Sequence, residues 1–161
     1  MRRYLSLPLA MLLAIGLAAP AAAAVRVVHV PGDGGWVQAI EVSGGDVLPV
    51  QTLGFAMTAK VPDFLVPGVA ISGSGPAGQW FQGFTCGDIE PSTDPAVVGQ
   101  CAVDDAFFGE LVGRVGEATF AIGDATTIEI PHGASGTLEL AVNDFTLTSA
   151  DNRGEFTVVF R

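Results

Sequence analysis

Short segments in which apolar and polar residues alternate recur along the chain after residue 24, and they predict a protein built of β-strands. Glycine and proline are frequent, at 21 and 10 residues, and many lie in the polar segments between these runs. After residue 24 no stretch keeps the 3.6-residue apolar spacing of an amphipathic helix. The predicted strands are 25–30, 36–42, 47–55, 111–115, 119–122, 126–130, 137–143 and 155–160.

The number and spacing of these strands indicate the architecture. About eight short strands separated by turns are typical of a two-sheet sandwich or a jelly roll. In the third strand, Pro49 and Gly54 suggest an edge position or a bulge. The sequence therefore predicts an all-β fold, with a single jelly-roll-like β-sandwich over residues 25–161.

The region between residues 56 and 104 is irregular, because prolines and glycines interrupt every run in it. Weaker strand patterns occur at 64–71 and 80–86. A region of this length in a compact domain is usually functional or covalently stapled. Cys86 and Cys101 are the only cysteines and both lie in it, so for an exported protein we expect one disulfide. Such a bridge contributes roughly 3 kcal/mol in the loop-entropy model.

Residues 1–24 have the pattern of a secretory signal peptide. Arg2 and Arg3 form a basic start, 5–17 is an apolar core, and the alanines after Pro20 provide a cleavage site. The alternative is a membrane anchor, but the apolar run is short for a span of about 20 residues. We therefore expect cleavage after Ala23 or Ala24 and a secreted or periplasmic protein that has no membrane-spanning segment after cleavage.

The chain is acidic, with 17 Asp and Glu residues against 7 Lys and Arg residues and a formal net charge of −10. Such a charge argues against nucleic acid and anionic membranes as partners. It also lowers the cost of holding a cation, although the acids could simply keep a small exported domain soluble. The length of 161 residues fits one domain beyond the signal peptide.

Nucleophilic catalysis finds little support in the sequence. His29 lies in a predicted strand and His132 beside a turn, and neither belongs to a recognisable catalytic motif. A structural or surface role is the expectation for both. Two carboxylates that meet only in space would suffice for glycoside hydrolysis, but no pair is singled out. We therefore do not expect an enzyme.

Oxygen-bearing side chains gather between the last two predicted strands. Asp144 leaves one strand, Asp151 and Asn152 precede the next, and Thr148 lies between them. Calcium takes six to eight oxygen ligands from carboxylates, amides and backbone carbonyls, and a loop of this kind can present several. The alternative is ordinary turn chemistry, since Asp and Asn also favour such loops by bonding their own backbone.

Three segments of the chain match the sequence pattern of a known protein family. Residues 43–47 read Ser-Gly-Gly-Asp-Val, and residues 105–116 read Asp-Ala-Phe-Phe-Gly-Glu-Leu-Val-Gly-Arg-Val-Gly. The third segment, 138–158, holds Asn143, Asp144, Thr148, Asn152, Gly154 and Phe156 at family spacing without a gap. Together these segments resemble the calcium-dependent galactose-binding lectins of the LecA (PA-IL) type. A weaker fourth match is Gly75-Pro76-x-Gly78.

The resemblance implies a sandwich that binds Ca²⁺ and, through the ion, a carbohydrate. It implies side-chain calcium ligands at Asp144, Asp151 and Asn152, and backbone carbonyl ligands at Thr148 and Thr58. Two sugar hydroxyls would complete the calcium shell, and the ion would polarise them so that they bond neighbouring carboxylates. Asp144, Asp151 and Thr148 are therefore also expected beside the sugar.

The chain departs from the family at several positions. Asp151 stands where the galactose-binding members have Asn, which keeps an oxygen ligand, removes an NH₂ donor to the sugar and adds a negative charge. Phe145 replaces a smaller residue and could contact a pyranose face or fill the core. The second sugar-contacting loop of the family has no clear match, and the 79–104 region stands in its place. There Gln82 is the candidate contact, while Trp80 and Phe81 are expected mainly in the core, as is Trp36.

Two interpretations of function follow. The first is an exported, non-enzymatic, calcium-dependent carbohydrate-binding protein, with galactose or another glycan as ligand. The second is a structural or adhesion module that binds a protein or a cell-wall component and uses calcium only for stability. They differ in whether the 79–104 region leaves room for a sugar at the metal. Assembly into a homo-oligomer would add avidity, but no strand is clearly built for pairing.

Overall fold

The computed structural model describes residues 24–33, 35–57, 75–79, 85–89, 100–145 and 152–161, and within them the fold is all-β, as predicted. The predicted signal peptide (apart from Ala24) and the strand predicted at 64–71 lie outside these residues. The elements are β1 (Arg26–Pro31), β2 (Val37–Val42), β3 (Val47–Met57), β4 (Ala77–Gln79), α1 (Cys86–Ile89), β5 (Phe108–Val115), β6 (Ala118–Ala121), β7 (Thr127–Glu129), β8 (Gly136–Val142) and β9 (Arg153–Phe160).

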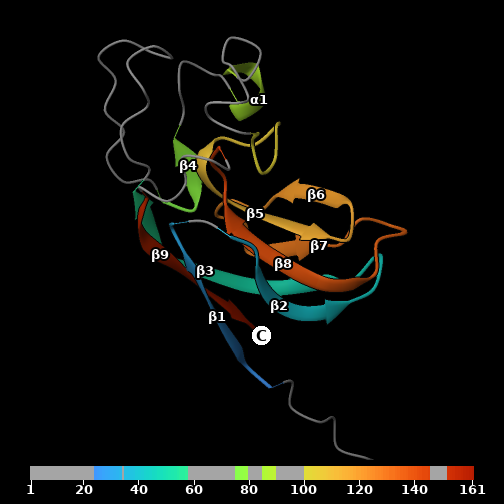
Figure 1. Ribbon diagram of the computed structural model, residues 1–161. Coiled ribbons are helices and arrows are strands. Elements are labelled where there is room, and N and C mark those ends of the chain that lie inside the picture. The colour runs from blue at the N-terminus through green and yellow to red at the C-terminus, as the bar shows by residue number, and fades with distance from the viewer. Residues whose placement is uncertain (1–23, 34, 58–74, 80–84, 90–99, 146–151) are drawn as a thin grey trace, which may run out of the picture.

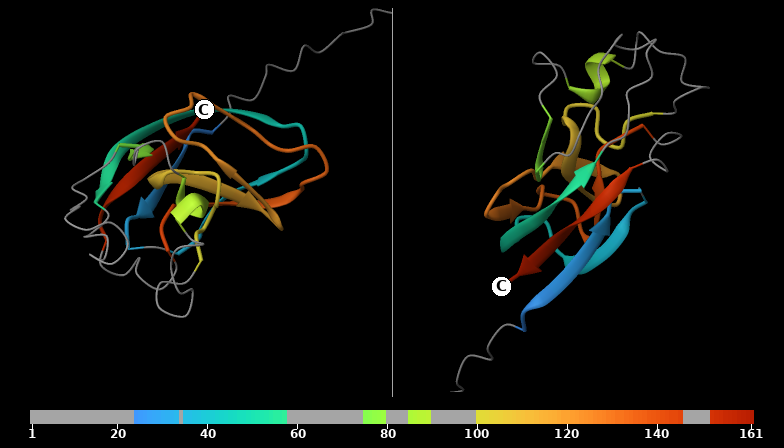
Figure 2. Two further views of the ribbon diagram at one scale, coloured as in Figure 1. Left: turned by 90° about the horizontal axis from the view of Figure 1, so that it is seen from above. Right: turned by 90° about the vertical axis from the view of Figure 1, so that its left-hand side faces the viewer.

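The strands form two antiparallel sheets that pack face to face, which confirms the sandwich (Figures 1 and 2). The first sheet has the order β1-β9-β3-β7. In the second sheet β2 pairs with β8 and β8 with β5, while β4 and β6 both pair along the far edge of β5. The chain passes between the sheets several times, so residues distant in sequence come together at the ends of the sandwich.

The main core lies between the sheets. In β9 the alternation of side chains turns Phe156, Val158 and Phe160 inward, and in β8 it turns Leu138 and Leu140 toward them. Full burial of one such side chain contributes about 1.5–3 kcal/mol. The other buried members are Val28, Val30, Ala39, Val42, Val50, Leu111, Val115, Ile122, Ile128, Ile130 and Val142.

A smaller apolar cluster covers the outer face of the second sheet. Val112 and Ala141 point away from the main core and pack against Val103 and Ala106, which precede β5. Seven of the eight residues of β5 are therefore buried, and the strand lacks the alternation expected of a sheet with one solvated face. Trp36 lies half-buried against this cluster rather than in the main core, with Arg114 stacked 4.4 Å from its ring centroid.

The third strand, for which Pro49 and Gly54 suggested an edge position or a bulge, lies inside its sheet between β9 and β7. It pairs with β9 on one side over Val50–Met57 and with β7 on the other over Val47–Pro49. Pro49 lies where the pairing changes from β7 to β9. Gly54 has a φ of +99°, and a Cβ there would lie 2.4 Å from the Glu155 carbonyl oxygen. Glycine at this position therefore reflects the close approach of β9.

The segment around the cysteines is held by a disulfide between Cys86 and Cys101, which confirms the predicted pairing. Cys86 begins α1, so the predicted strand at 80–86 is wrong at its end, and residues 80–84 lie outside the described residues. Cys86 is fixed by tertiary contacts, since its N–H donates to the Ala106 carbonyl over 2.9 Å. In the described part of the chain no helix is long and apolar enough to cross a membrane.

Candidate functional site

The candidate site lies at one end of the sandwich, where β8 ends and β9 begins (Figure 1). Two residues after β8, Asp144 turns toward Asn152, which directly precedes β9. The Asn152 amide Nδ2 donates to Asp144 Oδ2 over 2.9 Å. The structure thus brings together one carboxylate and one amide of the expected ligand set, from different sheets of the sandwich.

Both side chains of this pair are buried, with 8% of Asp144 and 1% of Asn152 exposed. The second carboxylate oxygen, Asp144 Oδ1, accepts the N–H of Phe145 over 2.6 Å. A buried carboxylate needs hydrogen bonds or a positive charge to offset its lost hydration. Here both oxygens accept N–H donors, so the orientation of the carboxylate is fixed.

The residues at this site fit a hard cation in their chemistry. Asp144 and Asn152 offer carboxylate and amide oxygens, which are the ligand types that calcium prefers. The other expected ligands, Thr58, Thr148 and Asp151, and the expected sugar contact Gln82, lie outside the described residues. Among the residues that are described, no three His, Cys, Asp or Glu side chains form a metal cluster.

Phe145 packs inside the protein. Its side chain is 2% exposed, and its ring makes an edge contact with Phe108 at 5.1 Å between centroids. Of the two roles that the sequence left open for Phe145, core packing is the one observed. Its backbone also pairs with Cys101, so the disulfide-bonded segment lies directly beside the site.

Asn143 has a positional role that sequence reasoning missed. Its fully buried amide accepts the Val103 N–H through Oδ1 over 2.9 Å and donates through Nδ2 to the carbonyls of Val103, Ala106 and Phe107 at 3.0–3.1 Å. A signal was present, because an amide at the end of an apolar strand needs partners if it is buried. The identity of those partners was not readable from the chain.

Glu110 is a second buried polar group outside the predicted set. It lies in β5, is 9% exposed, and its Oε2 accepts the Phe107 N–H over 2.8 Å. Burial raises the pKa of this carboxyl above its ordinary value, the hydrogen bond from Phe107 opposes the rise, and the nearby Asp105 and Asp124 add to it. An acid within the apolar run of β5 was the available sequence signal.

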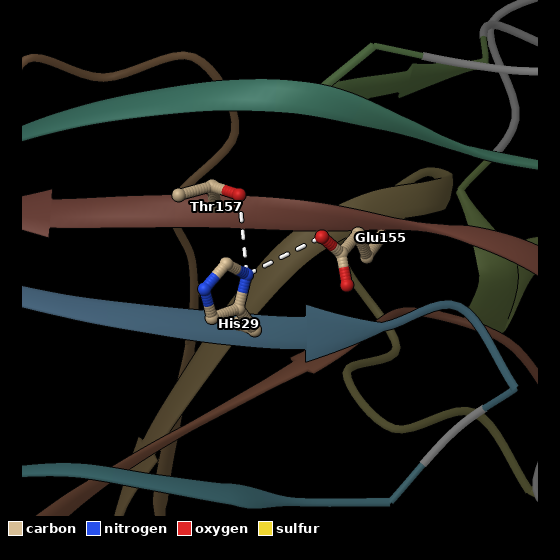
Figure 3. Close-up of polar contacts among 3 residues, drawn as sticks. All are labelled: His29, Glu155 and Thr157. Carbon is tan, nitrogen blue, oxygen red and sulfur yellow. Dashed lines mark hydrogen bonds and ion pairs between the residues drawn. The ribbon is translucent and has the colours of Figure 1, made fainter.

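The two histidines lie outside this site. His29 is exposed on β1, where its Nδ1 lies 3.3 Å from Glu155 Oε1 and 3.4 Å from Thr157 Oγ1 (Figure 3). Both contacts involve the same nitrogen, so the three residues do not form a relay through the imidazole from hydroxyl to carboxylate. His132 is exposed in the turn that precedes β8.

Comparisons with known proteins bear on the fold. No family model matches the chain, and no curated protein matches it either. Among solved structures it is similar to one described as the EclA N-terminal domain, a PllA-like lectin. The two are 18% identical with a TM-score of 0.52, and the match covers 84% of this chain and 93% of that one. This similarity shows a lectin-like β-sandwich fold.

Proposed function

We propose that the protein is an exported, non-enzymatic lectin that binds a carbohydrate through a calcium ion. The observation that carries this proposal is the buried Asp144–Asn152 pair, which joins the ends of β8 and β9 at 2.9 Å. The lectin-like sandwich and the sequence resemblance to the LecA type support the same function. The Cys86–Cys101 disulfide supports export, because such bridges persist in oxidising compartments.

In this proposal Asp144, Asp151 and Asn152 hold the ion through side-chain oxygens, and the carbonyls of Thr58 and Thr148 complete the protein ligands. The bound ion supplies two coordination positions for sugar hydroxyls and polarises them. Asp144, Asp151 and Thr148 then lie beside the sugar, with Gln82 as a contact from the 79–104 region. The ligand is galactose or a related glycan, and Asp151 in place of Asn shifts the preference among sugars.

A second function has one specific observation in its favour. Cys101 pairs with Phe145, so the segment between the disulfide and β5 lies beside the candidate site. If neighbouring residues of the 79–104 region cover the ion, calcium would only stabilise the fold. The protein would then be a structural or adhesion module with a protein or cell-wall partner.

A calcium titration by calorimetry tests the metal part of the proposal. Asp144→Asn keeps the shape of the side chain and removes its charge, and we expect calcium affinity to fall about tenfold or more, because affinity follows ligand charge. Asp46→Asn is the matched control, since the Asp46 carboxylate accepts the Ser43 N–H over 2.7 Å in a turn at the start of β3, and an Asn side chain keeps an oxygen there. Equal affinities in the two variants would contradict the proposal.

Titration of galactosides into the calcium-loaded protein then separates the two functions. Heat that appears only with calcium supports the lectin. Calcium binding combined with no response to any sugar would favour the structural module.

A further inference from the structure

The segment that connects Cys101 to Phe107, called here the 101–107 segment, is tied to α1 on one side. The Cys86–Cys101 disulfide makes one link. Two backbone hydrogen bonds make the others, from the Cys86 N–H to the Ala106 carbonyl over 2.9 Å and from the Gly87 N–H to the Asp104 carbonyl over 2.7 Å. The disulfide is thus part of a short, well-connected unit outside the sandwich.

On its other side the same segment is tied to the candidate site. The Asn143 side chain makes four hydrogen bonds to backbone groups of residues 103–107, and all four are between 2.9 and 3.1 Å. Glu110 adds a fifth from β5 by accepting the Phe107 N–H. The backbone of Cys101 pairs with that of Phe145.

Asp144 therefore lies between two residues whose positions depend on the 101–107 segment. Asn143 is fixed through its side chain, and Phe145 is fixed through its pairing with Cys101. The Phe145 N–H in turn holds Asp144 Oδ1 over 2.6 Å. A displacement of Cys101 would thus move Phe145, and with it the N–H that holds the Asp144 carboxylate.

We propose that Asn143 and the Cys86–Cys101 disulfide position Asp144, so that opening the disulfide lowers the ligand affinity of the site while the sandwich stays folded. The main core does not include Cys86, Cys101 or Asn143. Opening of the disulfide therefore leaves the packing between the sheets intact. The affinity part of this inference rests on the proposed calcium site. The positioning part stands on the hydrogen bonds alone.

The test compares the wild-type protein with a Cys86→Ser, Cys101→Ser double variant. We expect calcium affinity to fall about tenfold, as it does when groups that orient metal ligands are removed. Far-UV circular dichroism should stay that of the wild type. Reduction of the wild type should reproduce the loss and reoxidation should restore the affinity, which a permanently misfolded site would not do.

A matched control separates positioning from general stability. Val50 is 5% exposed and belongs to the main core. Val50→Ala removes buried volume there without changing the 101–107 segment. It should lower the melting temperature and leave calcium affinity unchanged. Equal losses of affinity in the control and the double variant would overturn the inference.

Amide hydrogen exchange without ligand tests the positioning of Asp144 independently of calcium binding. Exchange at Val103 and Phe145 should accelerate in the double variant and not in Val50→Ala. Unchanged exchange would overturn the positioning role, whether or not calcium binds. Faster exchange in a protein whose wild type binds no calcium would support the positioning role and overturn both the calcium site and the affinity part. Faster exchange with unchanged calcium affinity would overturn the affinity part alone.

Discussion

Asn143 and Asp144 are neighbours in the chain and both are buried, yet they serve different parts of the molecule. The Asn143 amide forms hydrogen bonds with the 101–107 segment. The Asp144 carboxylate accepts a hydrogen bond from Asn152, which precedes a strand of the other sheet. Asp144 and Asn152 could be predicted as candidate calcium ligands, because their side-chain oxygens and their spacing are visible in the sequence. The partners of Asn143 were not predictable, because they are backbone groups about forty residues away.

The buried carboxyl of Glu110 makes the stability of the protein depend on pH. Its folded-state pKa is raised, so the folded protein binds this proton more tightly than the unfolded chain does. The stability contributed by this group is therefore lost as the pH rises from the ordinary pKa of a glutamate through the raised pKa of Glu110. Glu110→Gln keeps an oxygen acceptor for the Phe107 N–H and removes the charge. We expect its melting temperature to exceed that of the wild type at neutral pH, with the difference vanishing below about pH 4.

Thermal denaturation of both proteins across this pH range makes the measurement. Glu117→Gln, an exposed glutamate in the turn after β5, controls for the loss of one negative charge. A wild type as stable as Glu110→Gln at neutral pH would show that the buried carboxylate carries no cost.

At the scale of elements, the contact between β3 and β9 depends on Gly54. Alanine there would need both a positive φ and room for a Cβ only 2.4 Å from the Glu155 carbonyl oxygen. We expect Gly54→Ala to lower the free energy of unfolding by about 3 kcal/mol or more. Gly116 also has a positive φ, of +60°, but a Cβ there meets nothing within 4 Å. Gly116→Ala should therefore cost only about 1 kcal/mol.

Urea denaturation of the two variants checks this difference. Equal losses would mean that backbone conformation alone explains both glycines and that β9 can move away from β3.

The strands that the sequence predicts most accurately are those with one buried face. Strands with one buried face, such as β1 and β9, show alternation and were predicted within one or two residues. The three-residue β4 and the four-residue α1 were not predicted, because pairing with β5 and the disulfide form them. β5 was predicted from Leu111 but begins at Phe108, since its outer face is also covered.

At the scale of the whole molecule, the fold gathers its polar buried groups at one end. Asn143, Asp144, Asn152 and Glu110 are the buried polar side chains among the described residues. The first three lie where β8 ends and β9 begins, and Glu110 is joined to them through the Asn143 N–H, which donates to the Glu110 carbonyl over 2.8 Å. Buried polar groups reduce stability unless they are paired, so their concentration at one end is typical of a binding site.

We propose that this end of the sandwich binds carbohydrate through calcium. A glycan array probed with the wild-type protein, once with calcium and once with a chelator, tests it most directly, with Asp144→Asn as the matched variant. We expect binding to at least one class of glycan, lost with the chelator and strongly reduced in the variant. Binding that the chelator does not affect, or no binding to any glycan in the presence of calcium, would contradict it.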